Sequence, residues 1–499
     1  METAMPASIS YEDVLPVAVP AIARRRRYYP QNGTTFNALG TQEIRIELSS
    51  ANALLDPLNS YLEFFVFNNN TGQTFGADLG GGHIFFEEVS VEQGGRVLAR
   101  EQAHNRLHAG ILSAAQVSDD GQLSESVTQL QRGCNSGLGG IANQMLPAPP
   151  GIDGANYANR RHNNMAQIAN NSGVRVTMAM PTGLFTQNKL LPLPLVRSDS
   201  PLTLVFRLAE PQFSGVWSGA IGANALEFRR MNYVAQMIEV GGDVLNQFKM
   251  MQQMSGGQLT ISTTDIEHSQ GVLPQNTQGE FIIRIPIRKR SVKSLLFQLN
   301  SVDVTQGPVG MNIRDLYNLS FGGNAAMTSY QLKVGSVVYP PTAVNCWGDP
   351  ARAAAAGVSD PGLERGECAL ELAKSLGTLG FTNPTGRLSS ITYGVNNQTA
   401  AGIAAGPLAD GDNGDALGNI VSTQDASVAS VCPFGLDLDA FQRTAIEAGI
   451  DSETLALETN LVINCGGAGS GIEDKNVHSY LIFDRHYYWN ADGTITTSE

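Results

Sequence analysis

Alternation of apolar and polar residues is the dominant periodic pattern along the chain, and it predicts β-strands rather than long helices. The alternation is regular at residues 44–48 and 174–178, where every second side chain is apolar, as expected for a strand with one buried face. Two more segments, 84–92 and 96–98, flank Gly94-Gly95 and predict a hairpin. Other strands of the first half are predicted at 60–67, 202–208 and 233–240. The pattern therefore predicts a mainly β protein.

The stretch 174–208 indicates how these strands are arranged. Its middle, residues 190–195, reads LLPLPL, which is apolar but interrupted by Pro192 and Pro194. Proline lacks the N–H that a sheet ladder needs, so this piece is predicted to be an edge or an extended crossing. A strand, an apolar proline-rich crossing and another strand form one route by which a chain passes between the two sheets of a β-sandwich.

The pattern then repeats after a short helix. Residues 244–254 have apolar positions four and three apart, and we expect Asp243 to cap this helix and Ser255-Gly256-Gly257 to end it. Strands are predicted beyond it at 259–261, 281–287, 292–299, 316–321, 330–339, 455–464 and 477–489. Helical segments are expected within 101–130 and 346–383 and at 437–448. A chain of 499 residues is long for one core, so we predict two domains that meet near residue 250.

Composition limits the function classes. Only 16% of the residues are charged, less than the roughly 25% of typical soluble domains, which suits a surface covered by neighbouring subunits; a merely polar surface fits the composition equally well. The net charge of −14 argues against a dedicated nucleic-acid-binding protein. Five widely spaced cysteines without a C-x-x-C pair indicate intracellular thiols. We expect neither a signal peptide nor a membrane span.

The strongest local charge is a run of four arginines, Arg24, Arg25, Arg26 and Arg27, followed by two tyrosines. Residues 1–30 are predicted to form an N-terminal arm without its own core. The run is a candidate contact with phosphate backbone or an acidic membrane face. Two simpler interpretations stay open: a solvated charge run, or an anchor for a neighbouring subunit's carboxylates.

Candidate chemistry is sparse, and we assign no catalytic, cofactor-binding or metal-binding residue. His104 and His108 lie four apart with Glu101 nearby, a spacing that can hold zinc, but no third ligand is evident and two surface or interface histidines are the simpler interpretation. Gly80-Gly81-Gly82 is interpreted as a flexible turn rather than a phosphate loop. Asp437 and Asp439 are interpreted as helix caps, and the cluster at 484–486 as an exposed strand end rather than an acid–base pair. We therefore expect the protein not to be an enzyme.

Several motifs resemble the double jelly-roll major capsid proteins of eukaryotic DNA viruses, including large DNA viruses, virophages and polinton-like viruses. The resemblance starts in 174–208, with Met178-Ala179-Met180-Pro181, then Phe185, then Leu191-Pro192-Leu193. Residues 233–240 with the helix around Phe248 resemble the link between the two rolls of that family. Residues 281–299, 330–341 and 437–439 resemble parts of the second roll in the same order. Two departures are the AMP sequence where the family usually has PLP, and a helix with few charges.

The resemblance implies an all-β fold of two consecutive eight-stranded jelly-roll β-sandwiches with short helices and long loops. The implied divisions are an arm (1–30), a first jelly roll (31–242), a linker helix (243–257) and a second jelly roll (258–499). The implied function is a structural capsid protein that forms homotrimeric, pseudo-hexameric capsomers in an icosahedral virion shell and assembles inside the host cell. Implied partners are neighbouring capsomers, minor capsid and penton proteins, and genome or internal membrane at the arm. The alternative is a carbohydrate-binding viral β-sandwich, a lectin or spike.

Overall fold

The computed structural model describes most of the chain between residues 21 and 498. The described part leaves out 70–74, 78–80, 113–166, 169–170, 181–182, 210–215, 218–225, 275–276, 278, 302–326, 347–365, 378–432, 440–448, 454–456 and 466–473. We expected long loops at 110–170 and 345–430; most of both ranges lies outside the described residues, although β8 (Gln167–Ile168) and α10 (Gly366–Gly377) fall within them. The predicted strand at 316–321 and most of the predicted helix at 437–448 also lie outside the described residues.

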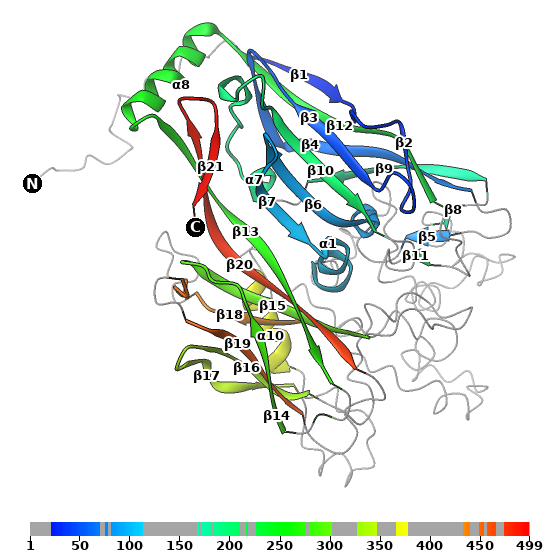
Figure 1. The fold of residues 1–499 in the computed structure, drawn as a ribbon, viewed down its shortest axis with the longest axis vertical. Coiled ribbons are helices and arrows are strands. Elements are labelled where there is room, and N and C mark those ends of the chain that lie inside the picture. The colour runs from blue at the N-terminus through cyan, green and yellow to red at the C-terminus, as the bar shows by residue number, and fades with distance from the viewer. Residues whose placement is uncertain are drawn as a thin grey trace, which may run out of the picture.

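The first half forms a sandwich of two antiparallel sheets (Figure 1). One sheet has the order β1-β12-β4-β9, with β2 also paired to β12; the other has the order β3-β10-β6-β7. The strands are β1 (Ala21–Tyr28), β2 (Thr35–Phe36), β3 (Glu43–Leu48), β4 (Ala53–Asn68), β6 (Phe86–Gln93), β7 (Arg96–Gln102), β9 (Ser172–Ala179), β10 (Leu202–Leu208) and β12 (Leu226–Val240). A small separate sheet joins β5 (Phe75–Ala77), β8 (Gln167–Ile168) and β11 (Val216–Trp217).

The second half forms a second sandwich. Its sheets have the orders β13-β20-β15-β18, with β21 paired to β20, and β14-β19-β16-β17. The strands are β13 (Gln258–Leu273), β14 (Gly279–Ile285), β15 (Val292–Ser301), β16 (Met327–Val334), β17 (Val337–Asn345), β18 (Phe434–Asp437), β19 (Thr459–Cys465), β20 (Lys475–Asn490) and β21 (Ile495–Ser498).

The two sandwiches have the same connectivity. If β2 and β21 are left aside and the other eight strands of the two main sheets in each half are numbered 1 to 8 in chain order, both halves have one sheet with the order 1-8-3-6 and one with the order 2-7-4-5. This is the eight-stranded, double Greek-key arrangement of a jelly roll. The fold prediction, two consecutive jelly rolls, is therefore confirmed. The periodicity predicted where strands lie, and the structure adds which strands pair.

The first strand of the first jelly roll is β1, which pairs with β12 from Ala21↔Val240 to Tyr28↔Tyr233. Residues 21–28 are thus an edge strand, whereas the sequence analysis assigned them to an arm. The alternation of apolar and polar residues did not predict β1, because its first seven residues are exposed and only Tyr28 is buried.

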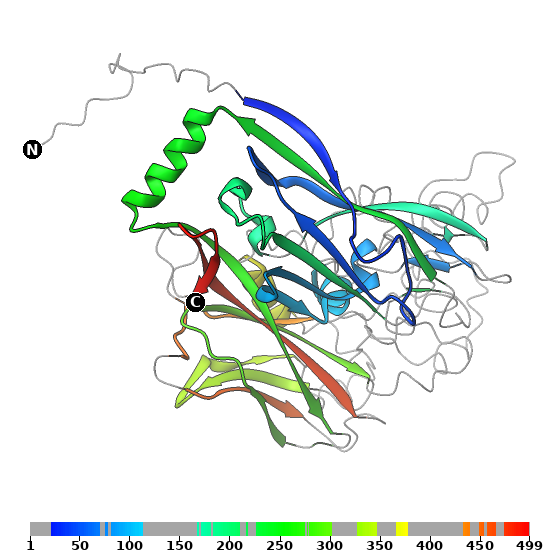
Figure 2. The same ribbon diagram turned by 45° about the horizontal axis from the view of Figure 1, so that its top comes forward.

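Short helices connect the strands. They are η2 (Gly81–Phe85), α1 (His104–Arg106), η3 (Leu107–Leu112), α7 (Gly183–Thr186), η6 (Leu193–Leu195), α8 (Gly242–Met254) and α10 (Gly366–Gly377). Helix α8 joins β12 to β13 and stands beside the first sandwich (Figure 2). Its N-cap is Gly241 rather than the predicted Asp243. In the part of the chain that the structure describes, no helix has the length and apolar character needed to cross a membrane.

The proline-rich segment is a crossing, as predicted. Leu191 makes a two-bond bridge to Leu55 of β4, and η6 follows with Pro194 inside its single turn. The segment Gly80-Gly81-Gly82 was predicted to be a flexible turn. Instead, Gly81 and Gly82 begin the 3-10 helix η2.

The two hydrophobic cores exchange residues. Ile261 of β13, Tyr487 and Trp489 of β20 and Ile495 of β21 pack into the core of the first sandwich. In return, Ala103, Leu107, Ile111 and Leu112 pack into the core of the second. Strands β13 and β20 make this possible because each has 16 residues and runs from the second sandwich up beside the first (Figure 1). The junction between the sandwiches is therefore built from both halves.

Candidate functional site

The four arginines predicted as a contact site lie on the edge strand β1 and are exposed. Arg24 lies 3.4 Å from the carboxylate of Glu239, and Arg27 donates to Glu63 at 3.0 Å. Arg26 donates to the Ser49 carbonyl and lies over the Tyr28 ring. The strand is thus held by its own subunit at several points, while its four arginines are exposed on an edge strand. Charged edge strands resist unspecific strand pairing, and such an edge can also receive an acidic partner.

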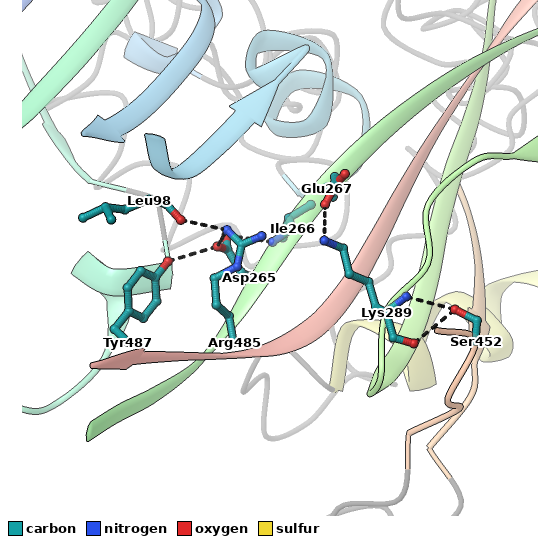
Figure 3. A network of polar contacts seen from close by, with 8 residues as sticks. All are labelled: Leu98, Asp265, Ile266, Glu267, Lys289, Ser452, Arg485 and Tyr487. Atoms are coloured by element: carbon teal, nitrogen blue, oxygen red, sulfur yellow. Dashed lines mark hydrogen bonds and ion pairs between the residues drawn. The ribbon is translucent and has the colours of Figure 1, made fainter. Parts of the chain in front are cut away.

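A polar network joins β13 and β20 to β7 of the first sandwich (Figure 3). Arg485 donates to Asp265 at 2.7 Å and to the Leu98 carbonyl at 3.1 Å, and Tyr487 donates to Asp265 at 3.1 Å. Burial raises the pKa of Asp265 although the Arg485 charge opposes the shift, and burial together with the Asp265 charge raises the pKa of Tyr487 well above its usual value. The network gives Arg485 and Asp265 hydrogen-bond and ion-pair partners in place of the water that they lose when the two sandwiches pack together.

A second group of contacts surrounds α1. Tyr480 donates to the Ala103 carbonyl at 3.0 Å, and Gln298 donates to the Arg106 carbonyl at 3.3 Å. Arg106 Nη1 lies 3.1 Å from His478 Nε2, and His478 Nδ1 lies 2.9 Å from His268 Nε2. Because a guanidinium can only donate, His478 must accept at Nε2 and donate from Nδ1 to His268.

Both histidines of this pair are neutral at pH 7. Burial, and then the Arg106 charge, lower the pKa of His268 to about 4. The same causes, with a further contribution from His268, lower the pKa of His478 well below its usual value. A cation on either ring would be placed beside a guanidinium in a poorly solvated position.

The C-terminal hairpin makes a third connection. Gln93 at the end of β6 donates to the Gly493 carbonyl at 2.8 Å and accepts from the Ile495 N–H at 2.6 Å. Gly493 has a φ of +80°, which favours glycine. The tight turn that it allows brings Ile495 back into the first core.

The histidines at 104 and 108 are brought together with His83, which the sequence analysis did not select. The three ring centroids lie 4.0 to 5.2 Å apart, and one ligand atom from each ring lies within 4.8 Å of the others. The expectation of a surface position is wrong for His104, which is fully buried, and the His108 side chain is 12% exposed. His83 lies 21 residues before His104 in the sequence, so no helical spacing relates it to His104 and His108. Only the tertiary fold brings the three side chains together.

Glu101 supports this histidine cluster. Its carboxylate accepts from His104 Nδ1 at 2.9 Å and lies 3.6 Å from His108 Nε2. Burial opposes ionisation of Glu101, but the charge of His104, the hydrogen bond from His104 and the nearby His108 ring outweigh it and hold the pKa of Glu101 at about 2. Burial, then the neighbouring histidines, lower the pKa of His83 well below its usual value; burial and His104 lower that of His108 to about 4.

The remaining candidates are structural. Asp484 lies 2.7 Å from the Lys293 ammonium, and His486 lies 2.7 Å from the Ser262 hydroxyl. Arg485 between them points into the junction instead, so the expectation of an exposed strand end is wrong for it. Asp437 accepts from the Asp439 N–H at the end of β18; the helix that these residues were expected to cap lies outside the described part.

No protein-family model matches the sequence, and no curated protein matches it. Solved structures do match. VP54 of PBCV-1, fitted into a cryo-EM reconstruction of the virophage Sputnik, is 10% identical, with 98% of this chain and 99% of that chain covered and a TM-score of 0.53. A quasi-atomic model of the PBCV-1 virus capsid is 9% identical, with the same coverage and a TM-score of 0.53.

A chain of the Sputnik virophage, from its 3.5 Å cryo-EM structure, is 10% identical, with 100% of this chain and 93% of that chain covered and a TM-score of 0.52. The similarity thus extends over both sandwiches, at an identity that carries information on fold alone. The resemblance that the sequence motifs indicated is confirmed at that level: the chain has the double jelly-roll fold, in common with these virus capsid structures.

Proposed function

We propose that this protein is a structural major capsid protein whose homotrimers form pseudo-hexameric capsomers of an icosahedral virion shell. The observation that carries the proposal is the tandem repetition of one jelly-roll connectivity within one chain. Two like units per subunit give six similar wall units in a trimer, and a six-fold outline tiles a flat array. The similarity to virus capsid structures over nearly the whole chain supports the same function.

Further parts of the proposal follow from this function. The protein is located in the virion capsid, is not an enzyme, and associates with itself and with minor capsid and penton proteins. We divide the chain into a first jelly roll up to residue 242, the linker helix 243–257 and a second jelly roll from 258. The proposed arm is residues 1–30, of which 21–28 form β1, and Arg24 to Arg27 on this strand contact the genome, an internal membrane or a minor protein at the inner surface.

The carbohydrate-binding alternative receives no support. Sugar sites need exposed tryptophan or tyrosine platforms; Trp489 is 1% exposed within a core, whereas Tyr29 is 63% exposed. The side chains of Trp217 and Trp347 lie outside the described part.

The test is the mass of the purified chain in solution. Size-exclusion chromatography with light scattering should give about 160 kDa, three times 53.2 kDa, and electron microscopy should show particles with a six-sided outline. A monomer at micromolar concentration would count against the proposal, and a monomer that binds glycans would favour the lectin.

The same assay examines β1. Replacing Arg24 to Arg27 with glutamine should leave trimers but impair closed particles, because the charge that meets an inner partner is lost. Replacement with lysine keeps the charge and is the matched control. If the glutamine variant loses the trimer and the lysine variant keeps it, these arginines instead contribute to contacts between subunits.

A further inference from the structure

Three imidazoles converge in the interior at the junction between the sandwiches. His83 Nδ1 lies 3.1 Å from His104 Nε2, and the ligand atoms of all three histidines lie within 4.8 Å of one another. In a tetrahedral zinc site with Zn–N distances near 2.05 Å, ligand nitrogens lie about 3.4 Å apart. The closest pair, which is hydrogen-bonded at 3.1 Å, lies about 0.3 Å short of this separation. His83 and His108 are stacked with 15° between their planes, so their rings would rotate apart to point at one ion.

Glu101 orients the cluster as a carboxylate does beside a metal-bound histidine. Its Oε1 accepts the proton of His104 Nδ1, which leaves the lone pair of His104 Nε2 facing His83. Metal-binding histidines commonly donate their second N–H to a carboxylate, which fixes the tautomer and the ring orientation. The Glu101 side chain is 5% exposed, so its negative charge also favours a cation close by.

His108 provides an independent observation. Its Nε2 is buried and makes no hydrogen bond within 3.5 Å, although the Glu101 carboxylate lies 3.6 Å away. Leaving a buried polar nitrogen without a partner is unfavourable. A bound ion would provide that partner.

The neighbouring pair His268 and His478 has the opposite character. It offers two imidazoles rather than three, and Arg106 occupies His478 Nε2. A guanidinium at that position repels a cation. The difference between the two histidine groups provides matched controls.

The position of the cluster gives it a mechanical role. His83 lies on η2, where Ile84 and Phe85 pack into the first core. His104 and His108 lie on either side of Leu107, which packs into the second core. An ion held by all three histidines would connect the two cores.

We propose that His83, His104 and His108 bind a divalent transition-metal ion, Zn²⁺, with Glu101 as the supporting carboxylate of His104. The ion fastens the base of the first sandwich to the second, and its remaining coordination position is filled by water or by Glu101. Imidazole nitrogens suit Zn²⁺ among the common divalent ions.

The first test is metal content. The full-length protein, purified without chelators and dialysed, should contain about one zinc ion per chain by elemental mass spectrometry. His83→Gln and His108→Gln should each lower this content at least tenfold, whereas His268→Gln and His486→Gln should leave it unchanged. Circular dichroism and gel filtration establish that each variant is folded.

The second test is thermal stability, and it needs no variant. EDTA should lower the Tm by about 5 °C, and added ZnCl₂ should restore it; Co²⁺ in place of zinc should give visible absorption bands of a tetrahedral site. The proposal is overturned if the unmodified protein neither contains nor binds zinc in a calorimetric titration. Zinc that stays bound to a folded His108→Gln variant would overturn it equally.

Discussion

Charged side chains in the interior of this protein occur in partnered sets. Arg485 and Asp265 form an ion pair whose side chains are 12% and 5% exposed. Lys289 stands in the basic run Arg288-Lys289-Arg290, a pattern typical of a solvated turn, yet it is buried: its ammonium lies 2.6 Å from Glu267 and 4.4 Å from the centre of the Phe483 ring. Ser452 holds its backbone through both N–H and C=O (Figure 3). A basic run in the sequence does not reveal which of its members has such partners.

Replacing Arg485 with methionine should destabilise the folded protein by about 3 kcal/mol, because the Asp265 carboxylate then stays buried without its counter-charge. Chemical denaturation with urea at pH 7 measures the change in the free energy of unfolding.

Arg290→Met is the matched control, because Arg290 pairs with Glu453 at the surface. Exposed pairs contribute about 0–1 kcal/mol, so this variant should unfold almost like the unmodified protein. Equal effects of the two substitutions would show that the junction ion pair has no special role. Adding Asp265→Asn to the Arg485 variant should recover part of the loss.

Strands β13 and β20 connect the two halves at the scale of secondary-structure elements. They pair over their full lengths, from Gln258↔Asn490 to Leu273↔Lys475. Their lower portions belong to the second sandwich, while Ile261, Tyr487 and Trp489 complete the core of the first. A boundary drawn in the sequence near residue 250 therefore divides the chain but does not divide the cores.

Trp489→Ala should destabilise the first sandwich although residue 489 lies at the C-terminal end of the chain. Trp489 is 1% exposed, and truncating a buried tryptophan costs about 3–5 kcal/mol. Hydrogen exchange should show faster exchange in β4 and β10, which share this core.

Met254→Ala is the control for that experiment, because Met254 on α8 is 85% exposed and such substitutions change stability by about 0.5 kcal/mol or less. Faster exchange confined to β20 and β21 would contradict the assignment of Trp489 to the first core.

For the whole molecule, the exchange of core residues and the buried polar contacts make the junction a shared structure. Its histidines link the stability of the assembled subunit to pH. His268 and His478 both have pKa values below that of an exposed histidine. They are therefore neutral in the folded chain at a pH where the unfolded chain would protonate them, and protonation favours unfolding.

Stability should accordingly fall as the pH is lowered from about 6.5 to about 4, by up to about 1.4 kcal/mol per pH unit for each of these two histidines. The contribution is complete above the unfolded-state pKa and is lost as the pH falls towards the folded-state pKa. A double variant, His268→Gln with His478→Gln, should show a shallower dependence of Tm on pH over this interval.

His486→Gln, which removes a histidine with an exposed contact to Ser262, should keep the original slope. If the double variant also keeps it, these two histidines do not determine the acid sensitivity.

Particular residues show how far the sequence alone predicts this structure. The strand at 43–48 was predictable because its residues alternately face the core and water, and its sequence accordingly alternates between apolar and polar residues. Strand β1 was not, because as an exposed edge strand it buries only Tyr28. His104 and His108 were selected by their spacing on one helical turn, but His83 comes from a different segment and has no local signal. Gln93 and Ile495 are 402 residues apart, so no periodicity connects them.

The sequence by itself determined the β class, the position of most strands, the proline-rich crossing and the repetition of the pattern after a short helix. These properties depend on neighbouring residues, whose apolar and polar order is local information. The tertiary structure decided the 1-8-3-6 and 2-7-4-5 pairing, the exchange of core residues, and the gathering of His83, His104 and His108. These three features depend on the path of the whole chain. Strand pairing and burial bring together segments that lie far apart in the sequence, so a local pattern cannot predict them.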